Sequence, residues 1–128
     1  MPKQIFIVDD SRIVRRLVRN YVESRLDYIV CTEAEDGLEA VGRAGEVKPD
    51  LILLDLVMPR MNGLEAAAAL HSMLPKVPII LFTLHEGVVS KRQAQAAGIR
   101  AVVSKTDRMD NLIEEILNFV GVARAATA

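Results

Sequence analysis

Residues 51–55 decide the fold and read Leu51-Ile52-Leu53-Leu54-Asp55. Consecutive side chains of an extended strand point to opposite faces of the sheet, so four aliphatic residues in a row need cover on both faces. Such a run is typical of an inner strand of a parallel sheet that has helices on both sides. A carboxylate directly after the run lies at the carboxyl end of the sheet, where open α/β sheets bind their ligands.

Similar short apolar runs recur along the chain, at Ile5–Val8, Tyr28–Cys31, Ile79–Phe82 and Ala101–Val103. The run at Tyr28–Cys31 is the most mixed, as expected of an edge strand. Apolar residues at helical spacing lie between the runs, and the segment from Met109 to Val120 shows this spacing most clearly. The alternation predicts an α/β (βα)5 fold with a doubly wound, five-stranded parallel sheet.

Several helix positions are expected from local signals. In the first helical segment, the residues that mark the apolar stripe are Ile13, Leu17, Val18 and Val22. The same segment carries four arginines, for which a solvated helix face is the preferred interpretation. A single fourth helix is expected to include Val88 and Ala97 and to end before Gly98. Thr106 or Asp107 is expected to cap the fifth helix.

Composition limits the classes of protein that the chain represents. Its 128 residues and 51% hydrophobic content indicate one globular domain, expected over residues 1–122, with 123–128 as a short tail without an output domain. A formal net charge of -1 argues against a broad nucleic-acid-binding surface. The single cysteine, Cys31, excludes an internal disulfide, and a buried thiol is expected. With neither a signal peptide nor a long apolar run, a cytoplasmic location is expected.

Polar residues follow four of the expected strands and should meet at one rim of the sheet. They are Asp9 and Asp10 after the first strand, Asp55 after the third, Thr83 after the fourth and Lys105 after the fifth. Crowded carboxylates repel one another unless a cation lies between them, and hard oxygen ligands suit Mg²⁺. A metal-bound aspartate is a competent nucleophile toward phosphorus, and an ammonium and a hydroxyl stabilise a transferring phosphoryl group.

The rim resembles that of a known family. The segment from Asp55 to Gly63 reads DLVMPRMNG and matches the acceptor-loop pattern Asp-x-x-Met-Pro-x-Met-(Asn or Asp)-Gly. Together with Asp9-Asp10-Ser11, Thr83 and Lys105, it resembles the receiver domains of bacterial response regulators, from about Lys3 to Val120. The resemblance implies a flavodoxin-like strand order of 2-1-3-4-5.

The resemblance also implies roles for individual residues. Asp55 would be the phosphoacceptor, and Mg²⁺ would be held by Asp9, Asp10, Asp55 and the backbone carbonyl of Val57. Thr83 and Lys105 would bind phosphoryl oxygens. Such a domain catalyses its own phosphorylation and dephosphorylation and is a switch rather than a metabolic enzyme.

Partners are implied in the same way. The phosphoryl group would come from a histidine kinase, a phosphotransfer protein or a small phosphodonor. It would switch the face formed by the fourth helix, fifth strand and fifth helix toward a downstream protein or an output domain in a longer chain. No direct contact with nucleic acid or membrane is expected. A second phosphorylated copy of the chain is a further candidate partner, in a phosphorylation-dependent dimer.

Three positions depart from the family pattern. Thr106 stands where the family usually has proline, and a trans peptide bond is expected before it because a cis bond to a non-proline residue costs ~3 kcal/mol. Val102 stands at the position of an aromatic switch residue. Leu84 stands where a small residue is favoured, and it either narrows access to Asp55 or packs toward the fourth helix.

Three other interpretations of these residues predict different sequence features. A haloacid-dehalogenase-type phosphatase needs a second aspartate where Val57 stands, and a flavodoxin-like nucleotide binder needs a Gly- and Ser-rich loop where Asp9-Asp10 stands. A degenerate receiver that acts only as a protein-interaction module stays open because of Val102 and Thr106.

Overall fold

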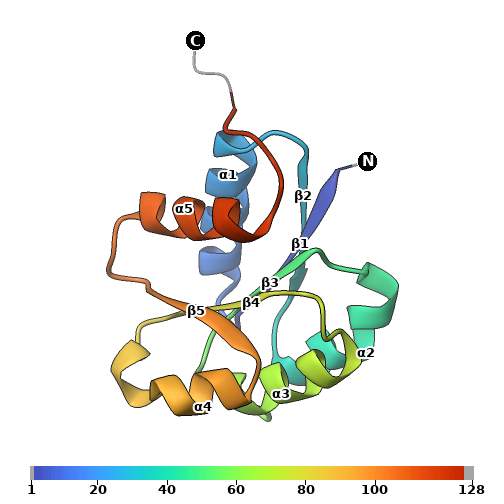
Figure 1. The fold of residues 1–128 in the computed structure, drawn as a ribbon, viewed down its shortest axis with the longest axis vertical. Helices are drawn as coiled ribbons and strands as arrows, with labels where there is room; N and C mark the ends of the chain where they lie inside the picture. Colours follow the sequence, from blue (N-terminus) through green and yellow to red (C-terminus); the bar gives the residue numbers. More distant parts are fainter. Residues whose placement is uncertain (1, 126–128) are drawn as a thin grey trace.

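The expected strands form one parallel sheet in the order β2-β1-β3-β4-β5, which confirms the predicted topology. The computed structural model describes residues 2–125 (Figure 1). The strands are β1 (Lys3–Val8), β2 (Ile29–Ala34), β3 (Leu51–Leu54), β4 (Ile79–Thr83) and β5 (Ile99–Ser104). The run expected at Tyr28–Cys31 corresponds to the edge strand β2, which begins and ends later in the chain, at Ile29–Ala34.

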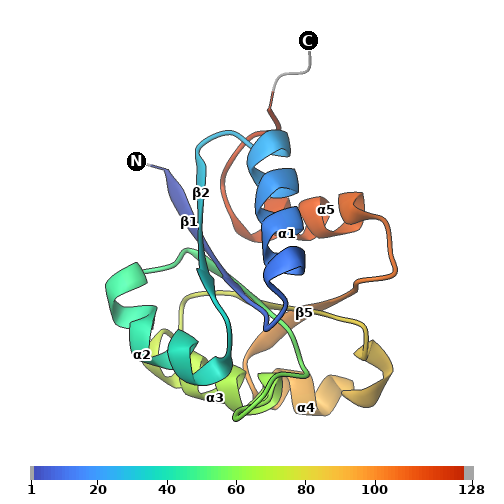
Figure 2. The same ribbon diagram turned by 180° about the vertical axis from the view of Figure 1, so that it is seen from behind.

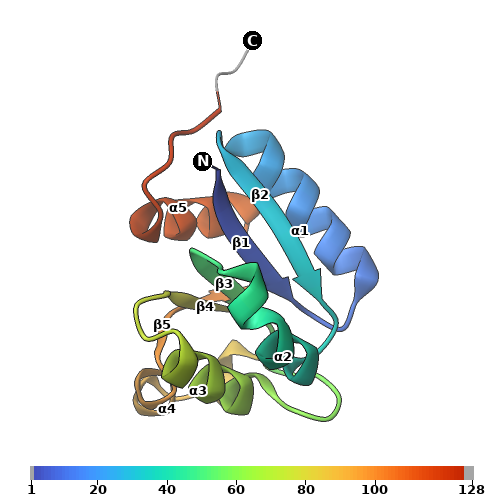
Figure 3. The ribbon, with the colours of Figure 1, turned by 90° about the vertical axis from the view of Figure 1, so that its right-hand side faces the viewer.

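Helices cover both faces of the sheet (Figure 3). They are α1 (Arg12–Arg25), α2 (Gly37–Val47), α3 (Gly63–Met73), α4 (Lys91–Ala96) and α5 (Met109–Phe119), with the short 3-10 helix η1 (Glu86–Val88) before α4. Helices α1 and α5 lie on one face, and α2, α3 and α4 lie on the other. This layering is the doubly wound arrangement that the alternating pattern predicts.

The core consists of two apolar layers that share the strands. Ile52 and Leu54 face the layer beneath α2, α3 and α4, whereas Leu51 and Leu53 face the layer beneath α1 and α5. All four side chains are at most 2% exposed. The run that decides the fold therefore serves both layers at once, and it fixes Asp55 at the rim between them.

The inner face of α1 differs from the expected stripe. Ile13 and Leu17 are 74% and 62% exposed, whereas Val18 and Val22 are buried with Val14 packed beside them. Residues four apart share a helix face, so Val14, Val18 and Val22 form the stripe that meets the sheet. Ile13 and Leu17 are each one position earlier in the chain and point away from the sheet.

The fourth and fifth helices also differ from expectation. Val88 lies in η1 and is 70% exposed, and α4 begins only after Ser90, whose hydroxyl and Gln93 form a capping box. Arg108 is the N-cap residue of α5 and makes no capping bond, so neither Thr106 nor Asp107 caps this helix. Gly98 follows α4 with a φ of 81°, as predicted for a helix end.

The segment after α5 returns to the end of α1. The amide of Asp27 donates to the carbonyl of Ala123 at 3.0 Å, and the amide of Ala125 donates to the carbonyl of Arg25 at 2.7 Å. Figure 2 shows this segment beside the carboxyl end of α1. The expected tail over 123–128 thus begins as a paired segment, and residues 126–128 lie outside the described part. Within residues 2–125, no helix is long and apolar enough to cross a membrane.

Candidate functional site

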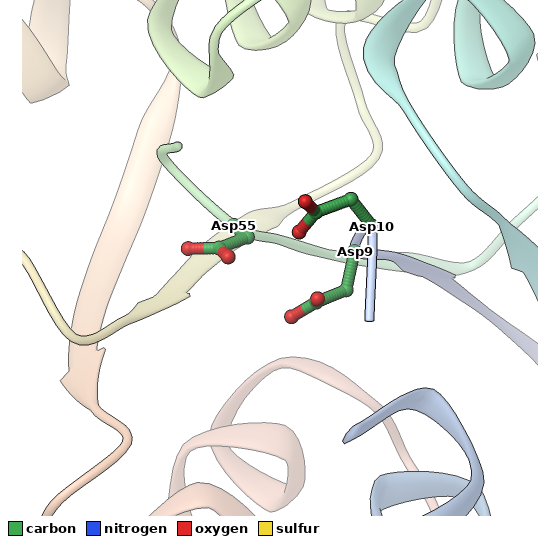
Figure 4. Close-up of side chains that lie close together, drawn as sticks. All are labelled: Asp9, Asp10 and Asp55. Atoms are coloured by element: carbon green, nitrogen blue, oxygen red, sulfur yellow. The ribbon is translucent and has the colours of Figure 1, made fainter. Parts of the chain in front are cut away.

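Three carboxylates meet at the carboxyl ends of β1 and β3. Asp9, Asp10 and Asp55 each offer an oxygen, and these oxygens all lie within 4.8 Å of one another (Figure 4). Asp9 and Asp55 are 4% and 7% exposed, whereas Asp10 is exposed to solvent. The cluster therefore has two buried members and one that faces the entrance.

Neighbouring residues in the loop between β1 and α1 make different hydrogen bonds. The hydroxyl of Ser11 accepts a bond from the amide of Val14 at 3.2 Å and is the N-cap of α1. The amide of Ser11 donates to Oδ1 of Asp9 at 2.8 Å, and Nη1 of Arg15 donates to the carbonyl of Asp9 at 2.6 Å. Because Ser11 supplies the cap, the Asp10 carboxylate is available for a ligand.

Lys105 is the counter-ion of the two buried carboxylates. Its Nζ lies 2.6 Å from Oδ2 of Asp9 and 3.0 Å from Oδ2 of Asp55. Burial disfavours the charged ammonium, but the hydrogen bonds to Asp9 and Asp55 outweigh this effect and raise the pKa of Lys105. For Asp9, burial dominates over the bonds from Lys105 and Ser11 and raises its pKa above the usual range.

Thr83 is fully buried beside this cluster. Its Oγ1 accepts a hydrogen bond from the amide of His85 at 3.1 Å, and its carbonyl accepts one from the amide of Lys105 at 2.9 Å. The hydroxyl hydrogen of Thr83 is not used in the bond with His85, so it can be donated to another acceptor. Leu84, next in the chain, is 59% exposed and belongs to neither core layer.

The loop after Lys105 has no proline and is shaped by side chains instead. The peptide bond between Lys105 and Thr106 is trans, as expected. The hydroxyls of Ser104 and Thr106 lie 2.7 Å apart, and the amide of Thr106 donates to Ser104 Oγ at 3.1 Å. These bonds close a local turn that directs the Lys105 side chain toward Asp9 and Asp55. The contribution of Ser104 to this turn was not predicted from the sequence.

Two backbone amides hold the acceptor loop, residues 55–63, in its conformation. The amide of Gly63 donates to the carbonyl of Leu56 at 2.7 Å, and the amide of Leu56 donates to Oδ1 of Asp55 at 2.7 Å. A Cβ on Gly63 would lie 2.3 Å from the carbonyl oxygen of Asp55, so any larger residue would force the backbone apart. The glycine of the acceptor-loop pattern is thus explained by close packing of backbone on backbone.

The donor set suits a small hard cation. Mg²⁺ prefers carboxylate and carbonyl oxygens and retains several waters, which agrees with a cluster that has two buried carboxylates and one exposed carboxylate. An all-oxygen set without histidine or cysteine is less typical of zinc and of softer metals. The residues present therefore fit the cation that the sequence led us to expect.

Fold and site together define a signalling receiver domain rather than a metabolic enzyme. The model of the response regulator receiver domain family matches residues 5–117, and the chain belongs to this family of two-component signalling proteins. It is 36% identical over 115 residues to the chemotaxis protein CheY of Listeria monocytogenes, with 88% of this chain and 94% of that protein covered. It is 32% identical over 116 residues to the response regulator protein VraR of Staphylococcus saprophyticus, with 91% of this chain but only 56% of that longer protein covered.

The comparison with solved structures agrees with this assignment. The response regulator protein TrrA of Thermotoga maritima, solved in complex with Mg²⁺ and BeF, has a TM-score of 0.83 and 28% identity. The match covers 92% of this chain and 99% of that one. The response regulator domain of Thermotoga maritima CheB has a TM-score of 0.83 and 27% identity, over 96% of this chain and 99% of that one.

Proposed function

We propose that Asp55 accepts a phosphoryl group in a Mg²⁺-dependent reaction, from a histidine kinase, a phosphotransfer protein or a small phosphodonor. One observation carries the proposal: Asp55 lies beside the acidic pair, Asp9 and Asp10, and also contacts the ammonium of Lys105. The cation would be held by Asp9, Asp10, Asp55 and the carbonyl of Val57. When bound, it neutralises charge on the transferring phosphoryl group.

The residues of the chain would carry the remaining steps. A carboxylate oxygen of Asp55 forms the new bond to phosphorus, and the bond from phosphorus to the donor breaks, with its electron pair leaving on the donor. Lys105 already contacts Oδ2 of Asp55 and is placed to pair with a phosphoryl oxygen on that residue. Thr83 has a hydroxyl hydrogen available to donate to a second phosphoryl oxygen.

The output would arise on the face formed by α4, β5 and α5. Thr83 ends β4 and Lys105 directly follows β5, so movement of Thr83 would pull on the loop before α4 and movement of Lys105 on the loop before α5. A groove of about 420 Å³ between α4 and β5, lined among others by Val89, Ala94 and Val102, lies on this face. A downstream protein, an output domain of a longer chain or a second phosphorylated copy would bind there.

Intact-mass measurement tests the proposal. Acetyl phosphate with Mg²⁺ should add one phosphoryl group to the wild-type chain, and neither EDTA-treated protein nor Asp55→Asn should gain it. Because Leu84 could narrow access to Asp55, a second measurement uses a smaller ligand: fluorine NMR detects the binding of beryllofluoride. A chain that neither gains the phosphoryl group nor binds beryllofluoride would be a protein-interaction module only.

A further inference from the structure

A salt bridge ties the acceptor loop to the start of α2. Nη2 of Arg60, in the middle of the acceptor loop, donates to Oδ2 of Asp36. Asp36 is only 1% exposed, and its other oxygen, Oδ1, accepts the amide of Glu39 at 2.8 Å as the N-cap of α2. Both oxygens of this buried carboxylate are therefore engaged, one by its own helix and one by the acceptor loop.

Arg60 adopts a backbone conformation that disfavours most side chains. Its φ is 69°, in the left-handed region, which is unfavourable for a residue other than glycine. Asp36 offsets this cost, because a buried carboxylate without a charged partner is strongly unfavourable. The side chain of Arg60 and the carboxylate of Asp36 thus hold the loop in a conformation that its backbone alone would not favour.

The next residue strengthens the same attachment. A Cβ on Gly37 would lie 3.1 Å from both Cγ and Sδ of Met61, so Met61 packs directly against the first residue of α2. Two consecutive residues of the acceptor loop, Arg60 and Met61, therefore contact two consecutive residues of the α2 start. The hydrogen bond from Gly63 to Leu56 closes the loop on its other side.

Val57 lies between these two attachments and has little anchorage of its own. Its side chain is 53% exposed and belongs to neither core layer, so side-chain packing does not hold its carbonyl in place. The position of that carbonyl is set by the loop that carries it. The loop in turn is set by the Arg60–Asp36 pair, the Met61 contact and the closure at Gly63.

We propose that the Arg60–Asp36 ion pair is a positioning device for the cation site, which holds the Val57 carbonyl and Asp55 in place before Mg²⁺ binds. This inference rests on the proposed function and adds two residues that touch neither the cation nor the phosphoryl group. Residues that orient metal ligands typically change metal affinity by about 10–100-fold when they are altered. Ordering the loop in advance lowers the cost of binding.

Mg²⁺ affinity, measured by NMR titration of the folded chain, tests the inference. Arg60→Ala should weaken Mg²⁺ binding by about tenfold, and Arg60→Lys, which keeps the charge, should recover most of the loss. Asp36→Asn keeps a cap oxygen for Glu39 and should weaken binding similarly, with the double variant no weaker than either single one. Arg124→Ala is the control, because it also removes an arginine from an ion pair, here with the exposed Glu114 of α5.

Two further variants, Arg60→Gly and Asp10→Asn, distinguish a loss of Mg²⁺ binding from a loss of folding. Arg60→Gly removes the ion pair but suits the positive φ, so it should fold at least as well as Arg60→Ala and still bind Mg²⁺ more weakly. Wild-type affinity in Arg60→Gly and Arg60→Ala, while Asp10→Asn loses binding, would overturn the positioning role and leave the proposed function intact. A wild-type chain that does not bind Mg²⁺ would overturn both.

Discussion

Nζ of Lys105 lies 3.0 Å from Oδ2 of Asp55, although the two residues are 50 positions apart in the sequence. The same ammonium lies 2.6 Å from Oδ2 of Asp9, so it bridges the two buried carboxylates of the rim. Lys105 therefore neutralises part of the acidic cluster without a metal. It also occupies the position from which a phosphoryl oxygen on Asp55 would be contacted.

Replacing Lys105 should show how much its ammonium stabilises the acidic cluster with and without Mg²⁺. In EDTA, Lys105→Met should lower the free energy of unfolding by about 2 kcal/mol, less than the ~3–5 kcal/mol of a fully buried pair because the rim borders solvent. Urea denaturation with and without EDTA measures this change. Mg²⁺ should add more stability to the variant than to wild type, because in the variant it is the only positive charge beside the carboxylates. Unchanged stability in EDTA would show that Lys105 is not the counter-ion.

Because of the acidic cluster, Mg²⁺ should increase the stability of the folded state. Mg²⁺ at ten times its Kd should stabilise the folded state by about 1.4 kcal/mol, which raises the Tm by several degrees. Asp10→Asn should raise the Tm in EDTA, because it removes one of three like charges without removing the cap provided by Ser11. It should also reduce the response to Mg²⁺. A variant that melts below wild type in EDTA would contradict the repulsion between the carboxylates.

Beryllofluoride should change the conformation mainly on the α4 side of the molecule. Under the proposed function, Thr83 and Lys105 would supply the contacts that differ between the two states, and Val102 would not act as the aromatic switch residue does in the family. Amide chemical shifts should therefore move between Thr83 and Ala97 and between Ser104 and Asp107. Thr83→Val, which keeps the packing but removes the hydroxyl, should still bind Mg²⁺ but show smaller shifts in α4.

The opposite pattern of shifts would place the output elsewhere. Changes along α1 and α2, with α4 unaffected, would contradict the assignment of the α4-β5-α5 face. The partner surface would then lie near the exposed side chains Ile13 and Leu17 and the arginines of α1.

A hydrogen bond between α1 and α5 should give the stability a pH dependence. The hydroxyl of Tyr21 donates to Oδ1 of Asp110 at 2.7 Å, and this bond lowers the pKa of Asp110 below its ordinary value of 3.8. A lowered pKa in the folded state means that the stabilisation is present above pH 3.8 and is lost as the pH falls through the folded-state pKa.

Tyr21→Phe isolates this bond. The variant should melt below wild type at neutral pH, and the difference should shrink as the pH falls below 3.8. The Arg25 guanidinium, 4.6 Å from the ring centroid, can still stack on phenylalanine, so the change reports chiefly on the hydroxyl. A Tm difference that is the same at neutral and acidic pH would contradict the role of Asp110.

The sheet and the rim were predictable because burial on both faces leaves a direct mark on the sequence. The run from Leu51 to Leu54 is apolar throughout, and the rule that sites lie at carboxyl strand ends then places Asp55, Thr83 and Lys105 near one another. These inferences need only the order of strands and helices. They do not depend on side-chain rotamers or on contacts between distant loops.

Details that depend on a choice between similar patterns were less predictable. In α1, Ile13 and Leu17 have the same four-residue spacing as Val14 and Val18, and only packing against the sheet selects the second pair. The break before α4 did have a signal in the capping box of Ser90 and Gln93. The pair of Arg60 and Asp36 had none, because it joins the acceptor loop to the start of α2 through a tertiary contact.

The central claim is that the phosphoryl group is attached to Asp55, and site mapping tests it most directly. Borohydride reduces an aspartyl phosphate to homoserine, which tandem mass spectrometry locates in the digested chain. After incubation with a phosphodonor and Mg²⁺, homoserine should replace Asp55 alone and should be absent when EDTA is present. Homoserine at Asp9 or Asp10, or a stable phosphate on Ser104 or Thr83, would contradict the account.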